Sequence, residues 1–346
     1  MSSSTLNYVT NLARLLRGDR ALRPLVAVYY VTTQCNLNCA YCEDFGQRRN
    51  TQAWAPLPLE EALRALRIVR SGVDHLILTG GEPLLHPDIV AIVRRIKQQR
   101  RGVTFATIIT NAFKLTPELV DGLNEAGLDS MQVSVDTIDP EPGLPKSLKS
   151  VLPKLTLLAE RARFQVKVQT VLTEQSRRRY GEFRDALAPF PFEFGFSLLH
   201  DAQGKIGLSG QHFADLLHQH ELFPGMAFFR RHAAEMLIGD FHRSWKCLGG
   251  FKYLYVNPDG RTQYCSQVPG GAQPIEATTL ADLRDADVHK PCEPGCALGC
   301  VRTVSHAMQN PLRSLGASLE ILGEFMHPHP KVQMVASREE APTARR

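Results

Sequence analysis

The sequence lacks any apolar run long enough to cross a bilayer, and its first residues, Met-Ser-Ser-Ser, form no apolar signal core. These absences argue against a transmembrane helix and a secretory signal. The 43% of hydrophobic and 22% of charged residues are typical of a soluble globular chain. We therefore expect a cytoplasmic protein.

Neither sign of charge dominates, since the formal net charge is only +5. Short arginine runs at residues 94–95, 100–101 and 177–179 lie at the edges of predicted helices. We interpret them as solvated faces, with recognition of an acidic substrate, a reductase or an anionic membrane surface as the alternative. No nucleic-acid-binding motif accompanies them, so we expect no nucleic-acid partner.

No cysteine lies outside two groups, although the chain has eight of them. The front group is Cys35, Cys39 and Cys42, and the back group is Cys247, Cys265, Cys292, Cys296 and Cys300. Nothing in the sequence points to an oxidising compartment, where disulfides persist. Clustered thiols in a reducing compartment indicate metal ligands instead.

The front cysteines follow a Cys-x3-Cys-x2-Cys spacing, which supplies three thiolates from one tight loop. A cubane iron-sulfur cluster takes four ligands, so three cysteines leave one iron open to an outside ligand. Zinc is the alternative, because clustered intracellular cysteines often bind it. Zinc sites favour Cys-x2-Cys pairs closed to four ligands, and the next cysteine after Cys42 is Cys247.

Apolar strands alternate with amphipathic helices from residue 25 to about 200. This order predicts an α/β fold in which parallel strands form an open or partial (β/α)6 barrel with the helices outside. Ligands in such folds collect at the C-terminal ends of the strands. We predict strands at 26–32, 75–79, 103–109, 131–135, 164–172 and 192–199, and helices at 59–69, 89–96, 116–127, 147–161 and 178–188.

The length of 346 residues favours one large domain and one smaller domain. We expect an N-terminal amphipathic helix over 1–22, docked on the barrel or on a membrane surface, before a barrel over 23–205. A small C-terminal domain of a β-hairpin, loops and a final helix is predicted over 206–326. The Pro- and Ala-rich tail, 327–346, is predicted to be disordered.

The front spacing, with Tyr41 directly before the last cysteine, resembles the signature of the radical S-adenosylmethionine (SAM) enzymes. The resemblance implies a partial (β/α)6 barrel with a [4Fe-4S] cluster whose open iron is chelated by SAM. It also implies reductive cleavage of SAM to a 5'-deoxyadenosyl radical that abstracts hydrogen from an unactivated C–H bond. A flavodoxin- or ferredoxin-type protein is then the expected electron donor.

Polar residues at later strand ends fit the same resemblance. The Thr-Gly-Gly-Glu-Pro segment at 79–83 resembles the family motif that binds the amino group of SAM, which implies that contact for Glu82. Polar residues on the following strands correspond to family contacts with the ribose and carboxylate of SAM. The implied cofactor-binding residues are Tyr41, Gly80, Gly81, Glu82, Asn111, Ser134, Asp136 and Gln169.

The back group surrounds a predicted hairpin. Strand residues 253–256 precede Asn257-Pro258-Asp259-Gly260, a strong β-turn signal, and the chain then returns to Cys265. This region resembles the SPASM and twitch domains, which carry auxiliary iron-sulfur clusters. The resemblance implies a second [4Fe-4S] cluster held by four of the five back cysteines, with Cys247 and Cys265 among them. A zinc ribbon is the alternative.

These resemblances imply a radical SAM oxidoreductase that carries out a net oxidation such as hydroxylation, dehydrogenation or bond formation. We expect its substrate to be a small molecule or a prosthetic-group precursor. The first alternative is a peptide-maturation enzyme that cross-links or oxidises side chains. A more distant alternative is a zinc-stabilised α/β binding protein without redox chemistry.

Overall fold

The computed structural model describes residues 26–42, 58–65, 75–98, 105–199, 245–266 and 274–293, with single residues and short runs elsewhere. Most of the predicted N-terminal helix, the predicted C-terminal helix, the tail and Cys300 lie outside the described residues. No helix in the part of the chain that the structure describes is long and apolar enough to cross a membrane.

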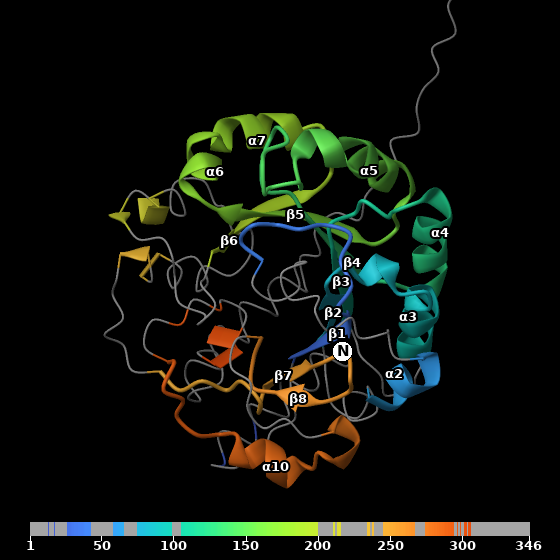
Figure 1. Ribbon diagram of the computed structural model, residues 1–346, viewed down its shortest axis with the longest axis vertical. Coiled ribbons are helices and arrows are strands. Elements are labelled where there is room, and N and C mark those ends of the chain that lie inside the picture. Colours follow the sequence, from blue (N-terminus) through green and yellow to red (C-terminus); the bar gives the residue numbers. More distant parts are fainter. Residues whose placement is uncertain are drawn as a thin grey trace, which may run out of the picture.

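One curved sheet organises the described residues (Figure 1). Its eight strands have the order β6-β5-β4-β3-β2-β1-β7-β8, and all neighbours are parallel except the β7–β8 pair. The strands are β1 (Val26–Thr32), β2 (His75–Gly80), β3 (Phe105–Thr110), β4 (Ser130–Ser134), β5 (Gln165–Leu172), β6 (Glu193–Leu198), β7 (Tyr253–Val256) and β8 (Thr262–Gln263).

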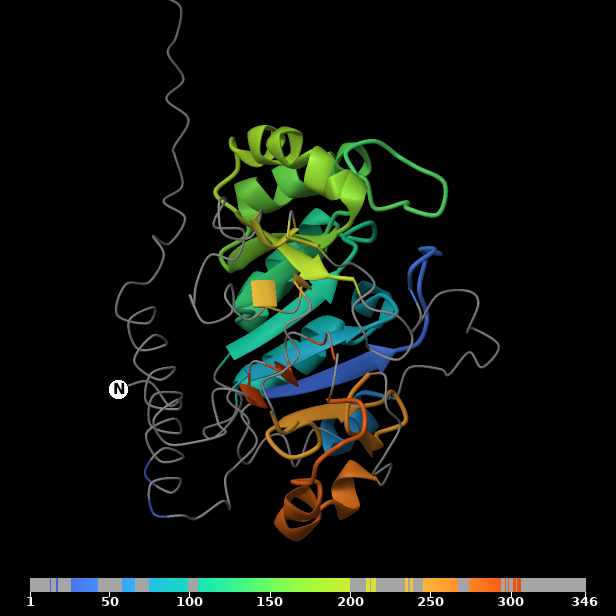
Figure 2. The same ribbon diagram turned by 90° about the vertical axis from the view of Figure 1, so that its left-hand side faces the viewer.

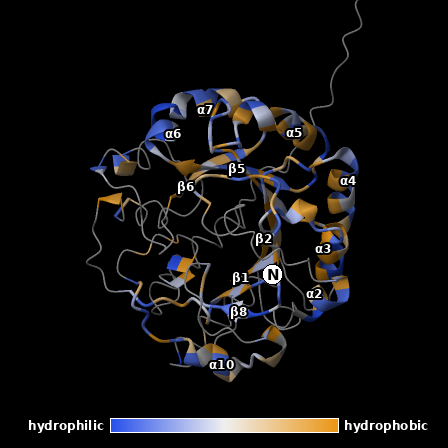
Figure 3. Cartoon of the chain, viewed as in Figure 1, coloured by the Kyte–Doolittle hydropathy of each residue, from blue (hydrophilic) through white to orange (hydrophobic). Residues whose placement is uncertain are grey.

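Helices cover the outer face of the strands, as Figure 1 shows, and the predicted α/β partial barrel is therefore confirmed. Figure 3 shows hydrophobic and hydrophilic residues side by side on these helices, in keeping with one buried face and one exposed face. The helices are α2 (Leu59–Ala65), α3 (Ile89–Lys97), α4 (Pro117–Ala126), α5 (Leu148–Arg161), α6 (Glu174–Arg178), α7 (Tyr180–Leu187) and α10 (Leu280–Asp285), with 3-10 turns at Pro83–Leu85 and Ile275–Ala277.

Local sequence signals define both ends of helix α4. Thr116 caps its start by accepting a hydrogen bond from the Leu119 amide at 3.2 Å, a contact that contributes about 1 kcal/mol in typical helices. Pro117 occupies the first turn, where its missing N–H costs nothing. Gly127 ends the helix with a left-handed φ of 83°. These boundaries are the predicted ones.

The helix predicted at 178–188 differs from the structure, which has two short helices, α6 and α7. Thr173 and Ser176 form a reciprocal capping box that starts α6 at Glu174, before the predicted start. Arg179, with φ −96° and ψ 13°, separates the two helices. The apolar periodicity of 178–188 therefore corresponds to α7, while the capping residues upstream of it start a separate short helix.

The β7–β8 hairpin extends the main sheet. Val26 and Val28 of β1 pair with Tyr253 and Tyr255 of β7 in parallel register, and Figure 2 shows the two strands alongside each other. The turn at 257–260 closes with Gly260 at a φ of 76°. The sequence predicted the hairpin but not its place beside β1. The two cysteine groups therefore belong to segments that adjoin neighbouring strands.

His75 begins β2 as a partly buried histidine. One ring nitrogen, Nε2, lies 2.9 Å from Thr107 Oγ1, and the ring meets Phe105 edge-on with centroids 5.2 Å apart. Burial disfavours the charged imidazolium and lowers the pKa of His75 to about 4. The folded chain therefore keeps this histidine neutral at pH 7.

This depressed pKa predicts a loss of stability in acid. The unfolded histidine takes up a proton near pH 6.5, whereas the folded one resists down to about pH 4. The contribution of neutral His75 to the unfolding free energy is complete above pH 6.5 and is lost as the pH falls toward 4. Between pH 7 and pH 5 we expect the unfolding free energy to fall by about 1–2 kcal/mol from this group, measured by urea titration.

The matched variant is His75→Gln, which keeps an amide group for Thr107 and cannot titrate. Its unfolding free energy should fall less between pH 7 and pH 5 than that of the unchanged protein, by the same 1–2 kcal/mol. An equal pH dependence in the two proteins would show that His75 does not contribute.

Candidate functional site

The front cysteines lie in the segment 33–42, here called the cysteine loop, which directly follows β1. Cys39 is buried, and Cys35 and Cys42 are partly buried. The Leu37 amide donates to Cys35 Sγ at 3.4 Å, and the Cys42 amide donates to the Cys39 carbonyl at 3.1 Å. The loop therefore turns tightly around its thiols.

The three thiols interact electrostatically. Burial raises the pKa of Cys39 to about 11, and Cys42 and Cys35 add to the rise, while Lys146 opposes it. Within the described ranges, no three His, Cys, Asp or Glu side chains are arranged to hold a single metal ion. The fit to a cluster therefore rests on donor chemistry: three soft thiol ligands on one short loop suit iron-sulfur ligation.

The end of β2 packs directly against the chain that enters the cysteine loop. The Gly81 amide donates to the Thr32 carbonyl at 2.9 Å, and the Glu82 amide donates to the Gln34 carbonyl at 2.8 Å. A Cβ on Gly81 would lie 2.2 Å from the Gln34 oxygen. Gly80 has a φ of 135°. The resemblance implies a cofactor contact for these glycines, and in the structure their backbone packs against the chain that enters the cysteine loop.

Glu82 is a buried carboxylate that connects neighbouring strand ends. Its Oε1 accepts from Thr110 Oγ1 at 2.6 Å and from the Leu84 amide at 3.0 Å, and its Oε2 accepts from the Asn111 amide at 2.7 Å. Burial raises the pKa of Glu82, while these hydrogen bonds oppose the rise. Since each carboxylate oxygen can accept two bonds, Oε2 retains capacity for an ammonium group.

Asn111 joins the end of β3 to the cysteine loop. Its Nδ2 donates to Asn36 Oδ1 at 3.0 Å, and its Oδ1 accepts from the Phe113 amide at 3.0 Å. The next residue, Ala112, is fully buried with a left-handed φ of 63°, which is uncommon for a residue with a side chain. The strand end is thus held in an unusual turn beside the thiols.

Tyr41 and Asp136 meet in the structure. Tyr41 Oη donates to Asp136 Oδ2 at 2.6 Å, and Lys146 Nζ donates to Tyr41 Oη. Lys146 Nζ also lies 3.2 Å from Asp136 Oδ2. Asp136 is therefore occupied by protein partners, and Lys146 is a residue near the thiols that the sequence analysis missed.

Ser134, the last residue of β4, is the register partner of Gln169 within β5. The Val135 amide donates to the Gln169 carbonyl at 3.0 Å, so the two strands stay paired up to this point. Alternating side chains put both residues on the same face of the sheet. The structure thus brings two of the sequence-predicted cofactor residues together at one edge.

Four back cysteines also gather. Burial raises the pKa of Cys296 to about 12, and Cys247, Cys265 and Cys292 add to the rise electrostatically. Cys247, Cys265 and Cys296 are buried, whereas Cys292 is partly buried. The sequence left open which two of Cys292, Cys296 and Cys300 join the first pair. Cys292 and Cys296 interact electrostatically with that pair, and Cys300 lies outside the described residues, so the choice among the three stays a prediction.

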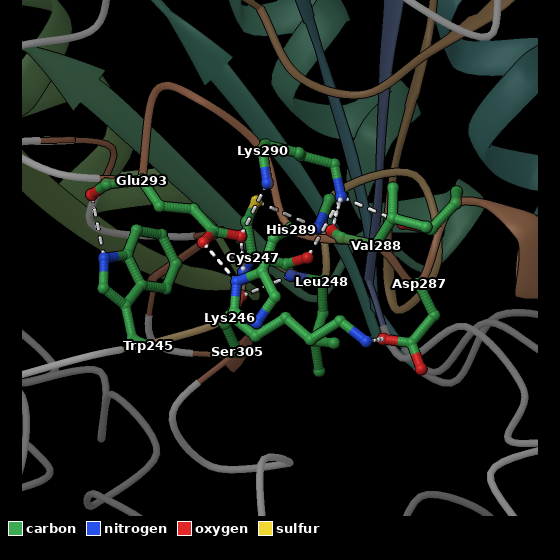
Figure 4. A network of polar contacts seen from close by, with 12 residues as sticks. Trp245, Lys246, Cys247, Leu248, Asp287, Val288, His289, Lys290, Glu293 and Ser305 are labelled. Atoms are coloured by element: carbon green, nitrogen blue, oxygen red, sulfur yellow. Dashed lines mark hydrogen bonds and ion pairs between the residues drawn. The ribbon is translucent and has the colours of Figure 1, made fainter.

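A buried polar network surrounds Cys247 (Figure 4). Glu293 Oε1 accepts from the amides of Cys247 at 2.7 Å and Lys290 at 3.0 Å, and Glu293 Oε2 lies 2.7 Å from His289 Nδ1. The Lys290 ammonium donates to the carbonyls of Cys247 at 3.1 Å and Ala286 at 2.9 Å. Glu293 and Lys290 were not among the predicted site residues, and the only sequence feature that links them to the site is that they lie close to Cys292.

Comparison with known proteins agrees with this geometry. Residues 29–167 match the profile of the Radical SAM superfamily. A probable GTP 3',8-cyclase from Pyrococcus abyssi is 40% identical over 123 residues, which cover 35% of this chain and 38% of that protein. The chain therefore aligns with little more than a third of this relative's length.

Solved structures share the fold. The enzyme anSMEcpe, solved with bound AdoMet, superimposes with a TM-score of 0.56 at 16% identity and covers 75% of this chain and 80% of its own. SuiB from Streptococcus suis, solved with its precursor peptide SuiA, gives a TM-score of 0.56 at 18% identity, covering 84% of this chain and 70% of its own. At these identities the likeness concerns the fold alone.

The packing of Gly81 yields a stability prediction. In Gly81→Ala the new methyl group would collide with the Gln34 backbone, so we expect urea unfolding to show a loss of more than about 1 kcal/mol. The control is Gly181→Ala in α7, where a Cβ meets no atom within 4 Å. That variant should be at least as stable as the unchanged protein, because alanine favours helices. Equal stability of the two variants would contradict the steric account.

Proposed function

We propose that this chain, whose residues 29–167 belong to the radical SAM superfamily, is an oxidoreductase that modifies a small molecule or prosthetic-group precursor. The observation that carries the proposal is the cysteine loop. Its three thiols lie beside the ends of β2 and β3, where Glu82 and Asn111 are fixed by hydrogen bonds. Such a site has ligands for a cluster and polar groups for the amino-acid and ribose parts of SAM at one edge of the sheet.

The chain's own residues have distinct roles in this proposal. Cys35, Cys39 and Cys42 would hold the first cluster, and a [4Fe-4S] cluster with SAM supplies hydrogen-abstracting radical chemistry when bound. Glu82 Oε2 would accept from the amino group of SAM. Polar residues on the neighbouring strands would orient the rest of the SAM molecule, namely Asn111, Ser134 and Gln169.

The four gathered back thiols would hold an auxiliary cluster. Cys247, Cys265 and Cys296 are buried away from water, and the amide of Gly249 donates to Cys247 Sγ at 3.3 Å, a contact that stabilises a thiolate. A cluster held there would supply a second redox centre able to take up one electron, which is why we propose a net oxidation of the substrate. A flavodoxin- or ferredoxin-type donor would supply the first electron.

A small-molecule substrate is favoured by sequence similarity. The relative from P. abyssi is named for a reaction of GTP, and it is 40% identical over the aligned segment. The likeness to SuiB, which was solved with a peptide, has 18% identity and concerns the fold. We therefore propose a small molecule, with a peptide substrate as the outcome that substrate trials would reveal.

Metal analysis tests the proposal directly. Protein purified without oxygen should contain about eight irons and eight sulfides per chain, as two cubane clusters require. Reduction in the presence of SAM should release 5'-deoxyadenosine, measured by chromatography. A content of about four irons per chain would mean that the protein holds only one cluster and no auxiliary one. Zinc in place of iron at both cysteine groups would instead identify a zinc-stabilised binding protein.

Two alanine variants separate the cysteine groups. Cys42→Ala removes one of three protein ligands to the first cluster, so SAM cleavage should be abolished. Cys265→Ala should retain uncoupled SAM cleavage while product formation stops. Iron content and 5'-deoxyadenosine are measured for both. Equal loss of SAM cleavage in the two variants would contradict a separate role for the back cysteines.

A further inference from the structure

The segment between β4 and α5, residues 135–147, folds back on itself and is here called the clasp. The Asp136 amide donates to the Lys146 carbonyl at 2.7 Å, and the Leu148 amide donates to the Thr137 carbonyl at 2.7 Å. Nearer its tip, the Leu144 amide donates to the Glu141 carbonyl at 3.0 Å. These bonds join the two arms of the clasp and fix the position of Lys146.

The clasp holds the cysteine loop by its backbone. The Ala40 amide, between Cys39 and Tyr41, donates to the Gly143 carbonyl at 2.7 Å. Gly143 has a left-handed φ of 74°, and a Cβ there would lie 2.9 Å from Ala40 Cβ. The close approach therefore depends on glycine.

Side chains make the second contact between clasp and loop. Lys146 Nζ reaches both Tyr41 Oη and Asp136 Oδ2, and it lies 5.1 Å from the centroid of the Tyr41 ring. The Lys146 side chain is 13% exposed and that of Asp136 is 2% exposed. Such a buried pair is costly to break, because removal of either partner would leave the other charge uncompensated in the interior.

The charge of Lys146 acts on the thiols. Burial alone would lower the pKa of Lys146, but Tyr41 and Asp136 outweigh it and raise that pKa above its usual range. The lysine therefore remains cationic. Tyr41, which Lys146 contacts, directly precedes Cys42 and follows Cys39 by two residues. The clasp thus places a buried cation, paired with Asp136, beside the turn of the loop that carries these two thiols.

We propose that Lys146 is a positioning residue that holds the cysteine loop through Tyr41 and sets the reduction potential of the cluster bound there. This inference rests on the proposed function, because it requires a cluster on the front cysteines. A cluster held by three thiolates gains negative charge when it is reduced, and a fixed cation nearby favours the reduced form. Lys146 would make the cluster easier to reduce.

The test compares four proteins reconstituted without oxygen: the unchanged chain, Lys146→Met, Lys146→Arg and Lys149→Met. Lys149 lies three residues along the chain and pairs with Asp139 at 2.5 Å, with 70% of its side chain exposed. Lys149→Met therefore makes the same chemical change at the surface. Redox titration followed by electron paramagnetic resonance reports the midpoint potential of the signal that responds to added SAM. Iron release to a chelator reports how firmly the loop is held.

We expect Lys146→Met to shift that midpoint to a more negative potential, measured without SAM, and to release iron about tenfold faster, the low end of effects from such outer contacts. Lys146→Arg, which keeps the charge, should have nearly the same potential and rate of iron release as the unchanged protein. The surface control Lys149→Met should also behave like the unchanged protein. A fourth variant, Tyr41→Phe, keeps the cation and loses the hydroxyl contact. It should speed iron release with little change in potential, and it tests the proposal even where Lys146→Met does not fold.

Other outcomes overturn the inference. A folded Lys146→Met with unchanged potential and iron release would show that the lysine only fills space. Weaker SAM binding with an unchanged SAM-free potential would show that Lys146 contacts SAM instead. An unchanged chain that forms no iron-sulfur cluster would refute the proposed function itself, which is a separate result from the comparison among variants.

Discussion

The site depends on backbone contact between two strand ends. The end of β2 lies so close to the chain leaving β1 that a Cβ on Gly80 or Gly81 would lie 2.2 Å from a backbone oxygen. This contact fixes where the cysteine loop begins and where Glu82 stands relative to it. The remaining contacts, from Asn111 to Asn36 and from Lys146 to Tyr41, attach to a loop whose start is already determined.

Much of the barrel could be predicted because its signals are local. Thr116, Pro117 and Gly127 lie within twelve residues of one another and define both ends of α4. The cysteine spacing and the Gly-Gly-Glu segment are also local patterns. The capping box at Thr173 and Ser176 is equally local, but it was not predicted, because α6 has only five residues and the stronger apolar periodicity lies in 178–188.

Contacts between distant segments could not be predicted. Lys146 and Tyr41 are 105 residues apart, and nothing in either local sequence pairs them. The placement of β7 beside β1 joins segments more than two hundred residues apart, and an isolated hairpin would have the same sequence pattern. The glycines at the end of β2 were expected to bind the cofactor, and nothing in their local pattern indicated that this chain's own backbone lies against them.

The parallel register of β1 and β7 also sets the spacing between the two thiol groups. The cysteine loop leaves the far end of β1, whereas Lys252, five residues after Cys247, bonds to Val26 at the near end, with the Val26 amide 3.3 Å from the Lys252 carbonyl. Strand β1 has seven residues, and at about 3.3 Å per residue it spans roughly 20 Å. The two thiol groups therefore adjoin opposite ends of one hydrogen-bonded strand, and the pairing of β1 with β7 keeps those ends apart.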